Sequence, residues 1–473
     1  MPVFSFATPL IGKTVRSLAR LTRHGGSAFP GKIAERLDPG FLARTLAQLP
    51  HGVVLVSGTN GKTTTTRMVA MMLEDLGYKV FTNPTGSNFT RGVVSALLQE
   101  VDLGGRLDAD IAVLELDEAY AVHFVRQVKP RYALLLNVMR DQLDRFGEID
   151  NTARLLGHVA EATTGTVVLN REDPRVAKLA ELVPGGTEVR YFGLADDLTR
   201  FFPSDDEMAT TVAASASTAP TVSSAGHGLT ADVTLMRVAD HAATFAMDGE
   251  TYETSVKLEG VYNLYNAAAA LAIVRSVVRD AGQSSAVPRS AAARQSGHAG
   301  RSVPTRSGTA ARSAADNSRL VRAVARVTPA FGRGEVIDVN GSPVELLLVK
   351  NPMGFRLSLA SFAPEGCDTM IAINDEYADG RDMSWLWDVD FTSLRGTGVS
   401  MVSGVRAWDM ALRLGYDEVP VETVEPDLES AVGAFVNANP GTPKHMYCTY
   451  TAMLAARAAL GRVAKVSDAG VGR

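Results

Sequence analysis

The feature that most constrains how this chain can fold is the segment Val53–Thr65, which has the sequence VVLVSGTNGKTTT. A short apolar run leads into a glycine-containing turn, and residues compatible with a helix follow. A buried strand that enters a helix through such a turn aims backbone N–H groups and the helix N-terminus at an anion. The usual pattern has glycine where this chain has Val56, so the segment predicts a variant phosphate-binding loop.

The polar residues of this loop have expected roles in ATP binding. Lys62 supplies a positive charge for the β- and γ-phosphates, and the Thr63 hydroxyl binds Mg²⁺. The backbone N–H groups around them face the phosphates. The predicted ATP contacts in the loop are Thr59, Asn60, Gly61, Lys62, Thr63 and Thr64.

A phosphate loop needs a second acid to hold Mg²⁺, and one stands at the end of another apolar run. Ile111–Leu114 predicts a strand that ends at Glu115. Carboxylates at the carboxyl ends of sheet strands lie where ligands bind in open α/β folds. Glu115 is therefore the predicted metal-binding and catalytic carboxylate, with a solvated acidic turn as the alternative. A further apolar run ends at Asn137, and the charged segment Arg140–Arg145 follows it. This segment is interpreted as part of the same site, with the start of a salt-bridged helix as the alternative.

Short apolar runs alternate with helical stretches along most of the chain. Such runs are typical of strands buried on both faces of a parallel sheet, with helices as crossovers. The pattern predicts an α/β fold, with a central ATP-binding domain over residues 51–280 and a smaller C-terminal α/β domain over residues 319–473. Residues 1–50 are expected to form an N-terminal helical segment.

The segment between the two predicted domains has a different composition. Residues 281–318 hold five arginines and one aspartate among many Ala, Ser and Gly. Such a segment buries too little apolar surface to offset its chain entropy, so we expect a disordered insert. Its arginines are solvated in this interpretation; contact with phosphate or an acidic partner is the alternative. Ser204–Gly228 is similarly expected to be a surface excursion.

Charge and cysteine content exclude several classes of protein. A net charge of −5 gives no basic excess for nucleic acid. The two cysteines, Cys367 and Cys448, lie far apart in the sequence, which fits a reducing cytoplasm and excludes a disulfide framework.

No apolar run is long enough to span a membrane, and Val3–Ile11 lacks the features of a secretory signal. The basic amphipathic stretch after it is a packing helix, or one that makes peripheral membrane contact.

Several motifs resemble those of the Mur ligases and the folylpolyglutamate synthases, in the family's order along the chain. Gly58–Thr64 resembles their nucleotide loop, and Glu115 matches their Mg²⁺ glutamate. Asn83–Asn88 is similar to their substrate loop. The substrate contacts that this resemblance implies are Thr85, Ser87 and Asn88.

Three later motifs extend the resemblance. Asp141–Asp144 is similar to the family's Asp-His-Leu-Asp, with glutamine in place of the histidine. Gly260–Asn266 resembles the adenine-binding segment, and Phe331–Glu335 resembles the start of the third domain, whose arginine reaches the nucleotide. The implied ligands are Gln142 for Mg²⁺ and Asn263, Asn266 and Arg333 for ATP.

One subgroup, the MurT subunits of lipid II isoglutaminyl synthases, matches best. Arg140–Arg145, Lys350–Phe355 and Asn374–Asp388 resemble MurT segments. The resemblance implies amidation, through an acyl phosphate, of the D-glutamate α-carboxylate in the stem peptide of lipid II or its precursor. It also implies an ammonia-supplying glutamine amidotransferase partner of the GatD kind, and substrate contacts from Lys350 and Asn351. The expected location is the cytoplasm, and the alternative is the inner face of the plasma membrane.

Two departures from the family concern metals. MurT proteins often carry a four-cysteine zinc ribbon, but the corresponding residues 192–247 contain no cysteine, so zinc is doubtful. Peptide-forming Mur ligases use a carbamylated lysine for a second Mg²⁺, and no lysine stands between Arg145 and Lys178. Because Gln142 also replaces the family's histidine, the sequence does not decide whether a second metal site is present.

The acidic segment around Trp385 and Trp387 has two interpretations. Its residue types fit a helix start with both tryptophans packed in the core. The resemblance implies instead that an aspartate reaches the partner's active site and orients its histidine, which favours Asp382, with Asp388 as the alternative. Exposed aromatic residues beside carboxylates also suit an interface.

Two other functions are alternatives to amidation. An amino-acid-adding ligase of the Mur or folylpolyglutamate type is disfavoured by the missing lysine and by the segment Asn374–Asp388. A non-catalytic ATP-binding scaffold for an amidotransferase is disfavoured by the intact Lys62, Thr63 and Glu115.

Overall fold

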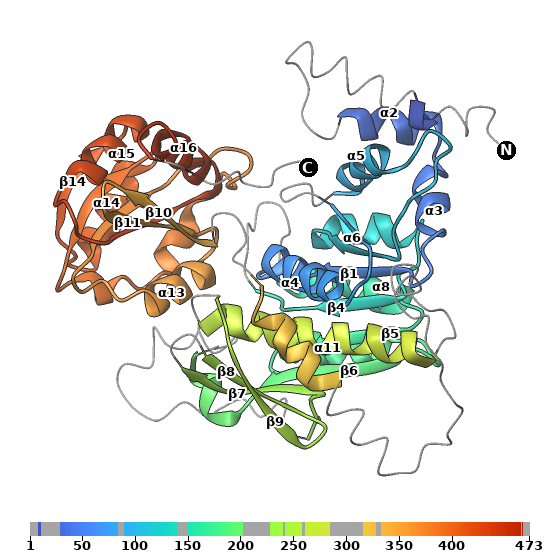
Figure 1. Ribbon diagram of the computed structural model, residues 1–473. Helices are drawn as coiled ribbons and strands as arrows, with labels where there is room; N and C mark the ends of the chain where they lie inside the picture. Colours follow the sequence, from blue (N-terminus) through green and yellow to red (C-terminus); the bar gives the residue numbers. More distant parts are fainter. Residues whose placement is uncertain are drawn as a thin grey trace. The chain divides into compact units, whose positions relative to one another are not determined.

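In the computed structural model the turn Gly58–Gly61, called the glycine loop below, follows strand β1. β1 is an interior strand of a nine-stranded sheet with the order β2-β3-β1-β4-β5-β6-β7-β8-β9 (Figure 1). The strands from β2 to β7 are parallel, and β7, β8 and β9 form an antiparallel meander. The strands are β1 Val53–Ser57, β2 Val80–Thr82, β3 Ile111–Glu115, β4 Tyr132–Leu135, β5 Thr166–Asn170, β6 Glu188–Leu194, β7 Val233–Ala239, β8 Ala242–Met247 and β9 Glu250–Ser255.

The structure describes residues 8–10, 29–83, 89–139, 149–201, 228–239, 242–257, 261–283, 316–327, 333–464 and 466. They fall into two units, each with its own sheet. Described residues within 1–138, 150–257 and 263–327 form the first unit, and those within 139–149, 258–262 and 328–473 form the second.

The central strands of the first unit are buried along their whole length. Every residue of β1, β3, β4 and β5 is buried, as expected for apolar strands covered on both faces. The helices of this unit are α2 Phe29–Leu37, α3 Phe41–Leu46, α4 Lys62–Asp75, α5 Thr90–Glu100, α6 Glu118–Val125, α8 Ile149–Ala162, α9 Pro174–Ala177, η1 Lys178–Leu182, η2 Asp196–Phe201, α11 Val261–Gln283 and a helix over residues 316–324.

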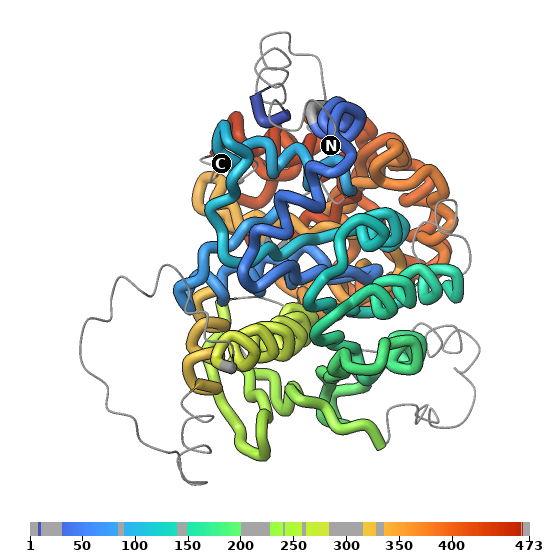
Figure 2. The backbone as a smooth tube through the Cα atoms, turned by 90° about the vertical axis from the view of Figure 1, so that its right-hand side faces the viewer, coloured from blue at the N-terminus to red at the C-terminus, as the bar shows by residue number. Residues whose placement is uncertain are grey.

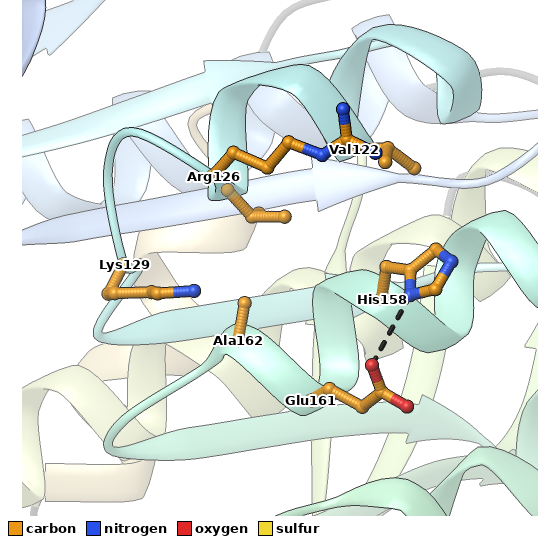
Figure 3. Close-up of a pocket in the computed structure, with 7 residues that line it drawn as sticks. Val122, Arg126, Lys129, His158, Glu161 and Ala162 are labelled. Atoms are coloured by element: carbon orange, nitrogen blue, oxygen red, sulfur yellow. Dashed lines mark hydrogen bonds and ion pairs between the residues drawn. The ribbon is translucent and has the colours of Figure 1, made fainter.

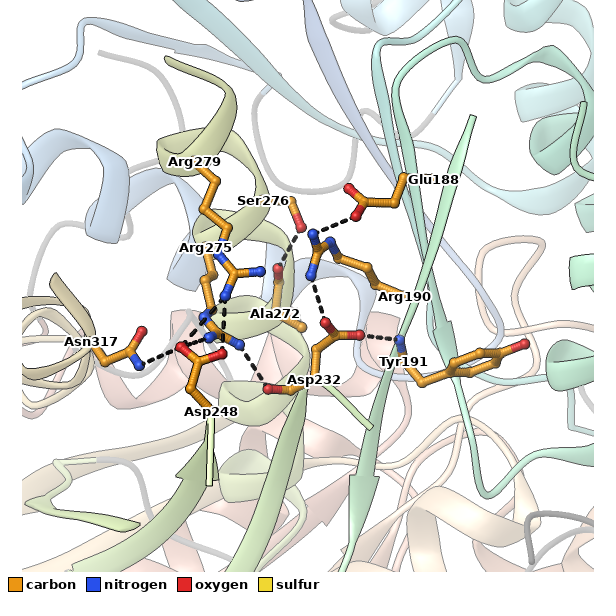
Figure 4. Close-up of polar contacts among 10 residues, drawn as sticks. All are labelled: Glu188, Arg190, Tyr191, Asp232, Asp248, Ala272, Arg275, Ser276, Arg279 and Asn317. Atoms are coloured by element: carbon orange, nitrogen blue, oxygen red, sulfur yellow. Dashed lines mark hydrogen bonds and ion pairs between the residues drawn. The ribbon is translucent and has the colours of Figure 1, made fainter. Parts of the chain in front are cut away.

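An ionic network ties the meander to α11 and to the helix over residues 316–324, which lies beside α11 in both views (Figures 1 and 2). Arg275 pairs with Asp248 and donates to the Asp232 carbonyl at 2.9 Å. Asn317 donates to the same Asp248 carboxylate at 3.1 Å, and Arg190 pairs with Asp232 (Figure 4). The network joins segments that are distant in sequence, so it fixes α11 against the edge of the sheet.

The second unit has a six-stranded sheet with the order β10-β11-β15-β12-β13-β14, in which only the β10–β11 pair is antiparallel among the described strands. Neighbouring residues of a strand face opposite sides. Leu347 therefore packs under α13 and α14, while Leu346 packs under α15 and α16. The elements are β10 Arg333–Val339, β11 Ser342–Leu348, α13 Pro352–Ser361, β12 Asp368–Ala372, η4 Ser384–Asp388, η5 Thr392–Leu394, β13 Val399–Ser403, α14 Ala407–Tyr416, β14 Val421–Glu425, α15 Leu428–Asn437, β15 Lys444–Cys448 and α16 Tyr450–Leu460.

The structure confirms the α/β fold with a large, mostly parallel sheet and a second, smaller sheet. It differs from the predicted insert at both ends. α11 continues to Gln283, and a helix begins at residue 316 because Leu320, Val321 and Val324 supply a buried apolar face. The rest of the insert, and residues 204–227 of the expected surface excursion, lie outside the described residues. No helix in the described part of the chain combines the length and apolarity needed to cross a bilayer.

Candidate nucleotide site

Two glycines shape the turn between β1 and α4, and each has a positive φ. Gly58 has φ +132°, and a Cβ there would lie 3.0 Å from the backbone N and O of Asn137. Gly61 has φ +84°, and a Cβ there would lie 2.5 Å from Oδ1 of Asn266. A larger residue at either position meets both backbone strain and a close neighbour. The turn thus depends on glycine at both positions.

Asn137, just beyond the end of β4, holds the loop in place. Its Oδ1 accepts the N–H of Asn60 at 2.8 Å, and its Nδ2 donates to the Asn60 carbonyl at 3.0 Å. Its own carbonyl accepts the Thr59 N–H at 3.0 Å. These residues are buried, and the three hydrogen bonds pair their polar groups with one another and fix the loop backbone.

Lys62 is buried at the start of α4, with its ammonium turned back toward the loop. Nζ donates to the Gly58 carbonyl at 2.6 Å and lies 3.2 Å from Oε2 of Glu118 and 4.0 Å from Oδ1 of Asp117. A buried cation is retained where it has such partners. The ammonium is therefore held at the N-terminal end of α4, where the phosphates of a nucleotide are expected.

Thr63 and Glu115 form the second part of the site, at the carboxyl ends of β1 and β3. The Thr63 hydroxyl donates to Oε1 of Glu115 at 2.9 Å. Two adjacent ligands of an octahedral Mg²⁺, each about 2.0–2.1 Å from the ion, lie about 2.9 Å apart. The two oxygens therefore fit neighbouring positions around Mg²⁺. Asn83 exchanges two hydrogen bonds with the Glu115 backbone, at 3.0 and 2.9 Å, and fixes the strand end that carries the carboxylate.

α11 brings the predicted adenine segment to the same loop. Asn266 is buried with its Oδ1 next to Gly61, and Asn263 is half-buried one turn earlier on the helix. The Tyr265 hydroxyl contacts Oδ1 of Asn170 at the end of β5, and Asn170 in turn donates to the Leu136 carbonyl at 2.8 Å. α11, β5 and β4 are therefore linked behind the loop.

Asp173 supports the end of β4 from behind. Its Oδ2 accepts the Val138 N–H at 2.7 Å, and its Oδ1 accepts the N–H groups of Arg175 and Val176 at the start of α9. Burial raises the pKa of this carboxyl to about 6, although the three N–H groups favour the charged form. The carboxylate thus fixes the backbone directly after Asn137.

The predicted residues divide into three groups in the structure. The nucleotide-loop residues come together with Glu115 and Asn266 in the first unit. Lys350, Asn351, Asp382 and Asp388 lie in the second unit. Thr85, Ser87, Asn88, Gln142 and the side chain of Arg333 lie outside the described residues.

The predicted residues of the second unit have local roles in its fold. Asn351 is fully buried and caps α13, where its side chain accepts the Gly354 N–H at 2.8 Å. Lys350 is half-buried beside it. Asp382 is exposed, and hydrogen bonds from Ser384 hold its pKa below the usual range. The Asp388 side chain is exposed, and its carbonyl accepts from Arg356.

The interpretation of a tryptophan pair packed in the core is wrong for one of its members. Trp385 is buried in the apolar layer under α13 and α14, but Trp387, two residues later, is 52% exposed. The segment forms the single 3₁₀ turn η4, which points the two rings in different directions. Trp387 therefore belongs to the surface.

Sequence reasoning assigned no role to Glu118 and Asn170, and it named Asn83 and Asn137 only as the start of the substrate loop and the end of an apolar run. Each stands at, or just after, the carboxyl end of a strand, or at the start of the following helix. That position is a usable signal, because ligands bind at this edge of an open α/β sheet. Their partners depend on the strand order, which the local pattern does not give.

A separate hollow of about 350 Å³ lies at the other end of α6 from Lys62 (Figure 3). Its lining includes Arg126 and Lys129 after α6, and His158 and Glu161 on α8, which contact each other at 3.2 Å. None of the predicted site residues lines it. This hollow is therefore distinct from the candidate nucleotide site.

Two family models match the chain. The Mur ligase middle domain matches residues 56–274, and the MurT ligase C-terminal domain matches residues 348–453. A relative from Streptococcus pneumoniae, the subunit MurT of a glutamine-hydrolyzing lipid II isoglutaminyl synthase, is 30% identical over 92% of this chain and 92% of its own. The same subunit from Staphylococcus aureus strain N315 is 27% identical over 89% and 90%.

Solved structures of Mur ligases share the fold. MurF from Acinetobacter baumannii matches with a TM-score of 0.63 and 16% identity, over 91% of this chain and 80% of that one. MurF from Thermotoga maritima, solved in complex with ADP, matches with a TM-score of 0.59 and 16% identity, over 90% and 84%. At this identity the likeness shows the fold alone.

Proposed function

Since the chain belongs to the MurT family of Mur ligases, which are ATP-dependent ligases, we propose that it amidates the D-glutamate α-carboxylate of the lipid II stem peptide. The product is D-isoglutamine, and the reaction passes through an acyl phosphate. Ammonia comes from a glutamine amidotransferase subunit of the GatD kind. The chain acts in the cytoplasm, at the inner face of the plasma membrane, where it reaches a lipid-linked substrate.

Lys62, Thr63 and Glu115 carry this proposal. A buried ammonium at the end of the glycine loop and two oxygens 2.9 Å apart are the groups that phosphoryl transfer from MgATP requires. The arrangement fits a chain that itself activates a carboxylate, and it disfavours a passive scaffold. Asn266 at Gly61 is the proposed contact of α11 with the nucleotide.

The proposed reaction has two bond changes. A carboxylate oxygen of the substrate attacks the γ-phosphorus of ATP as the bond to ADP breaks; ammonia then attacks the acyl carbon and loses a proton as phosphate leaves. Lys62 stabilises the charge on the transferring phosphoryl group. Thr63 and Glu115 hold Mg²⁺, which when bound neutralises charge on the phosphate oxygens. Asn137 and Asn83 keep the two halves of the site in position before the nucleotide arrives.

Glutamine hydrolysis is assigned to a separate subunit because the relatives are named as one subunit of a glutamine-hydrolyzing synthase, and the environment of the cysteines in this chain agrees with that. Cys448 is fully buried, which raises the pKa of its thiol to about 12. Burial and neighbouring carboxylates also raise the pKa of Cys367. A catalytic cysteine needs the opposite environment, one that favours the thiolate. Asp382, exposed in the second unit, is the proposed contribution of this chain to the partner's catalytic histidine.

The proposal is tested with the purified chain, lipid II, ATP, Mg²⁺ and ammonium. We expect ATP hydrolysis together with a product in which an amino group replaces one carboxyl hydroxyl, as read by mass spectrometry. Lys62→Ala should abolish both signals, and Lys79→Ala, an exposed lysine paired with Asp108 at 2.6 Å, should leave them unchanged. Incorporation of an added amino acid, with no amide from ammonium, would replace the proposal with the peptide-ligase alternative.

A further inference from the structure

The hollow between α6 and α8 combines positively charged groups with an apolar lining. Arg126 caps the end of α6, and Lys129 stands in the loop that leads to β4. Figure 3 shows these two side chains on the α6 side of the hollow, opposite His158 and Glu161 of α8. The apolar part of the lining consists of residues that are almost fully buried, namely Val122, Val125 and Ala162. A concave surface of this kind suits a small ligand that has both a charged and an apolar part.

The two cations of the hollow are not neutralised by the protein. Neither Arg126 nor Lys129 forms an ion pair or a side-chain hydrogen bond with any residue that the structure describes. The carboxylate that shares the hollow, Glu161, contacts Nδ1 of His158 at 3.2 Å instead. The dipole of α6 favours a cation at the end of the helix, which accounts for Arg126 but not for Lys129, three residues further on. The pair is therefore available to an anion from outside the chain.

Backbone hydrogen bonds hold the two sides of the hollow together. The Pro130 carbonyl, directly after Lys129, accepts the Thr164 N–H at 3.0 Å and the Thr164 hydroxyl at 3.2 Å. Thr164 follows the end of α8, so this contact joins α8 to the loop that carries Lys129. At the start of the loop the Val128 N–H donates to the Phe124 carbonyl at 2.9 Å. The backbone around the hollow is therefore fixed before a ligand binds, which lowers the entropy lost on binding.

We propose that the hollow binds a small phosphorylated molecule, with its phosphate held by Arg126, Lys129 and His158. Arg126 offers a planar fork of N–H donors, and Lys129 offers a compact positive charge. When the His158 ring is protonated, Nδ1 donates to Glu161 and Nε2 donates to the ligand. Three donor groups suit the three terminal oxygens of a phosphate monoester better than the two oxygens of a carboxylate. The organic part of the ligand covers the apolar lining.

The size and the place of the hollow limit the ligand further. Its volume of about 350 Å³ is at the lower end of the range for ligand pockets, which favours a small phosphate ester over a nucleotide. α6 has eight residues and spans about 12 Å, and its first residue, Glu118, is the one that contacts Lys62. A molecule bound at the other end of α6 therefore takes no part in phosphoryl transfer. The inference is independent of the proposed function.

The test follows the imidazole of His158 by NMR while inorganic phosphate or phenyl phosphate is added to the full chain. The signal is assigned by its loss in His158→Gln, and His51, which is buried in the same unit, is the internal reference. We expect both probes to shift the His158 signal to saturation. Phenyl phosphate should bind about fivefold more tightly, because burial of about 40 Å² of apolar surface is worth that factor. No saturable shift with either probe would overturn the proposal.

Two matched double variants test the role of the cations. Arg126→Gln combined with Lys129→Gln removes the pair in the hollow, and Arg106→Gln combined with Lys32→Gln removes two other exposed cations of the same unit. Both variants have the same net charge. The first should bind phenyl phosphate at least about tenfold more weakly, because it loses two charge-assisted contacts to the phosphate. The second should bind like the wild type. Equal affinities of the two variants would contradict a site at the hollow.

Two further probes identify the source of the anionic group. Benzoate carries a carboxylate on the same ring, and we expect it to bind at least about tenfold more weakly than phenyl phosphate, because it has one oxygen and one charge fewer. Equal binding of the two probes would overturn the assignment to phosphate. Vesicles of phosphatidylcholine with phosphatidic acid present a phosphate monoester on a lipid. Sedimentation with these vesicles that requires Arg126 and Lys129, without binding of phenyl phosphate, would replace the small molecule with a membrane lipid.

Discussion

Asn137 and Asn60 exchange two hydrogen bonds: the Asn137 side chain accepts the Asn60 N–H at 2.8 Å and donates to the Asn60 carbonyl at 3.0 Å. The pair joins the end of β4 to the middle of the glycine loop, and both residues are buried. The loop is thereby held by a neighbouring strand in addition to its own turn. Its N–H groups are fixed in direction before a nucleotide binds, which lowers the cost of binding.

Asn137→Ala is expected to weaken nucleotide binding. The change removes two buried hydrogen bonds and leaves two backbone groups of Asn60 without these partners, a cost of about 2–3 kcal/mol. Because this cost falls on the loop conformation that binds the nucleotide, ATP affinity is expected to drop by about 30- to 160-fold. Isothermal titration with ATP measures it, and Asn437→Ala, an exposed asparagine on α15, is the control. Unchanged affinity in Asn137→Ala would show that the turn alone holds the loop.

Lys62→Met is expected to lower the rate of ATP-dependent amide formation by about 1,000-fold, because loss of one positioned charge at the transferring group typically costs about 100- to 1,000-fold. The buried carboxylate of Glu118 also loses its partner at 3.2 Å. A second substitution, Glu118→Gln in the Lys62→Met background, should restore thermal stability but not activity. Recovery of activity in the double variant would mean that Lys62 acts only by neutralising Glu118.

Glu115→Gln is expected to raise the Mg²⁺ concentration needed for half-maximal ATP hydrolysis by at least about tenfold, since a neutral amide binds Mg²⁺ more weakly than a carboxylate. Thr63→Ser, which keeps the hydroxyl that lies 2.9 Å from Glu115, should retain activity, and Thr63→Val should lose it. Activity should recover in part at high Mg²⁺ for Glu115→Gln. The same Mg²⁺ dependence in Glu115→Gln and wild type would exclude Glu115 as a ligand.

Asp173 is expected to make stability depend on pH. Burial raises its pKa to about 6 in the folded protein, from 3.8 for an ordinary aspartate. The folded state therefore binds more protons than the unfolded state between these values, so its stability falls as the pH rises from about 4 to about 6, by about 3 kcal/mol at most. Urea unfolding of wild type and Asp173→Asn should be measured across this pH range. The free energy of unfolding of wild type should fall relative to that of Asp173→Asn as the pH rises. A constant difference would contradict the shift.

Arg413→Met is expected to destabilise the second unit by about 3 kcal/mol, because it removes a buried cation and the hydrogen bonds that its guanidinium donates to the Leu386 and Val389 carbonyls. All three tryptophans lie in this unit, so tryptophan fluorescence follows its unfolding separately from the first unit. Arg395→Met, at an arginine that is half-exposed, should change stability by less than about 1 kcal/mol. Equal effects of the two substitutions would show that Arg413 contributes no more than a surface arginine.

The sequence by itself determined the α/β fold, the glycine loop and the elements around it. Strands β1, β3 and β5 are short, mainly apolar runs, as expected for strands buried on both faces of a parallel sheet. Lys62 and Thr63 follow the loop directly, and Glu115 ends its own strand, so their places at one edge of the sheet were predictable. These features are local: each depends on residues within a few positions along the chain.

Only the tertiary structure decided which groups meet. Asn137 reaches Asn60 and Asn83 reaches Glu115 because the strand order is β2-β3-β1-β4, and no local pattern specifies that order. Trp385 and Trp387 stand in the same turn, yet one is buried and the other exposed, because Arg413 on α14 fixes the turn that carries them. Hydrogen bonds and burial are set by neighbours distant in sequence, and these neighbours exist only after the chain has folded.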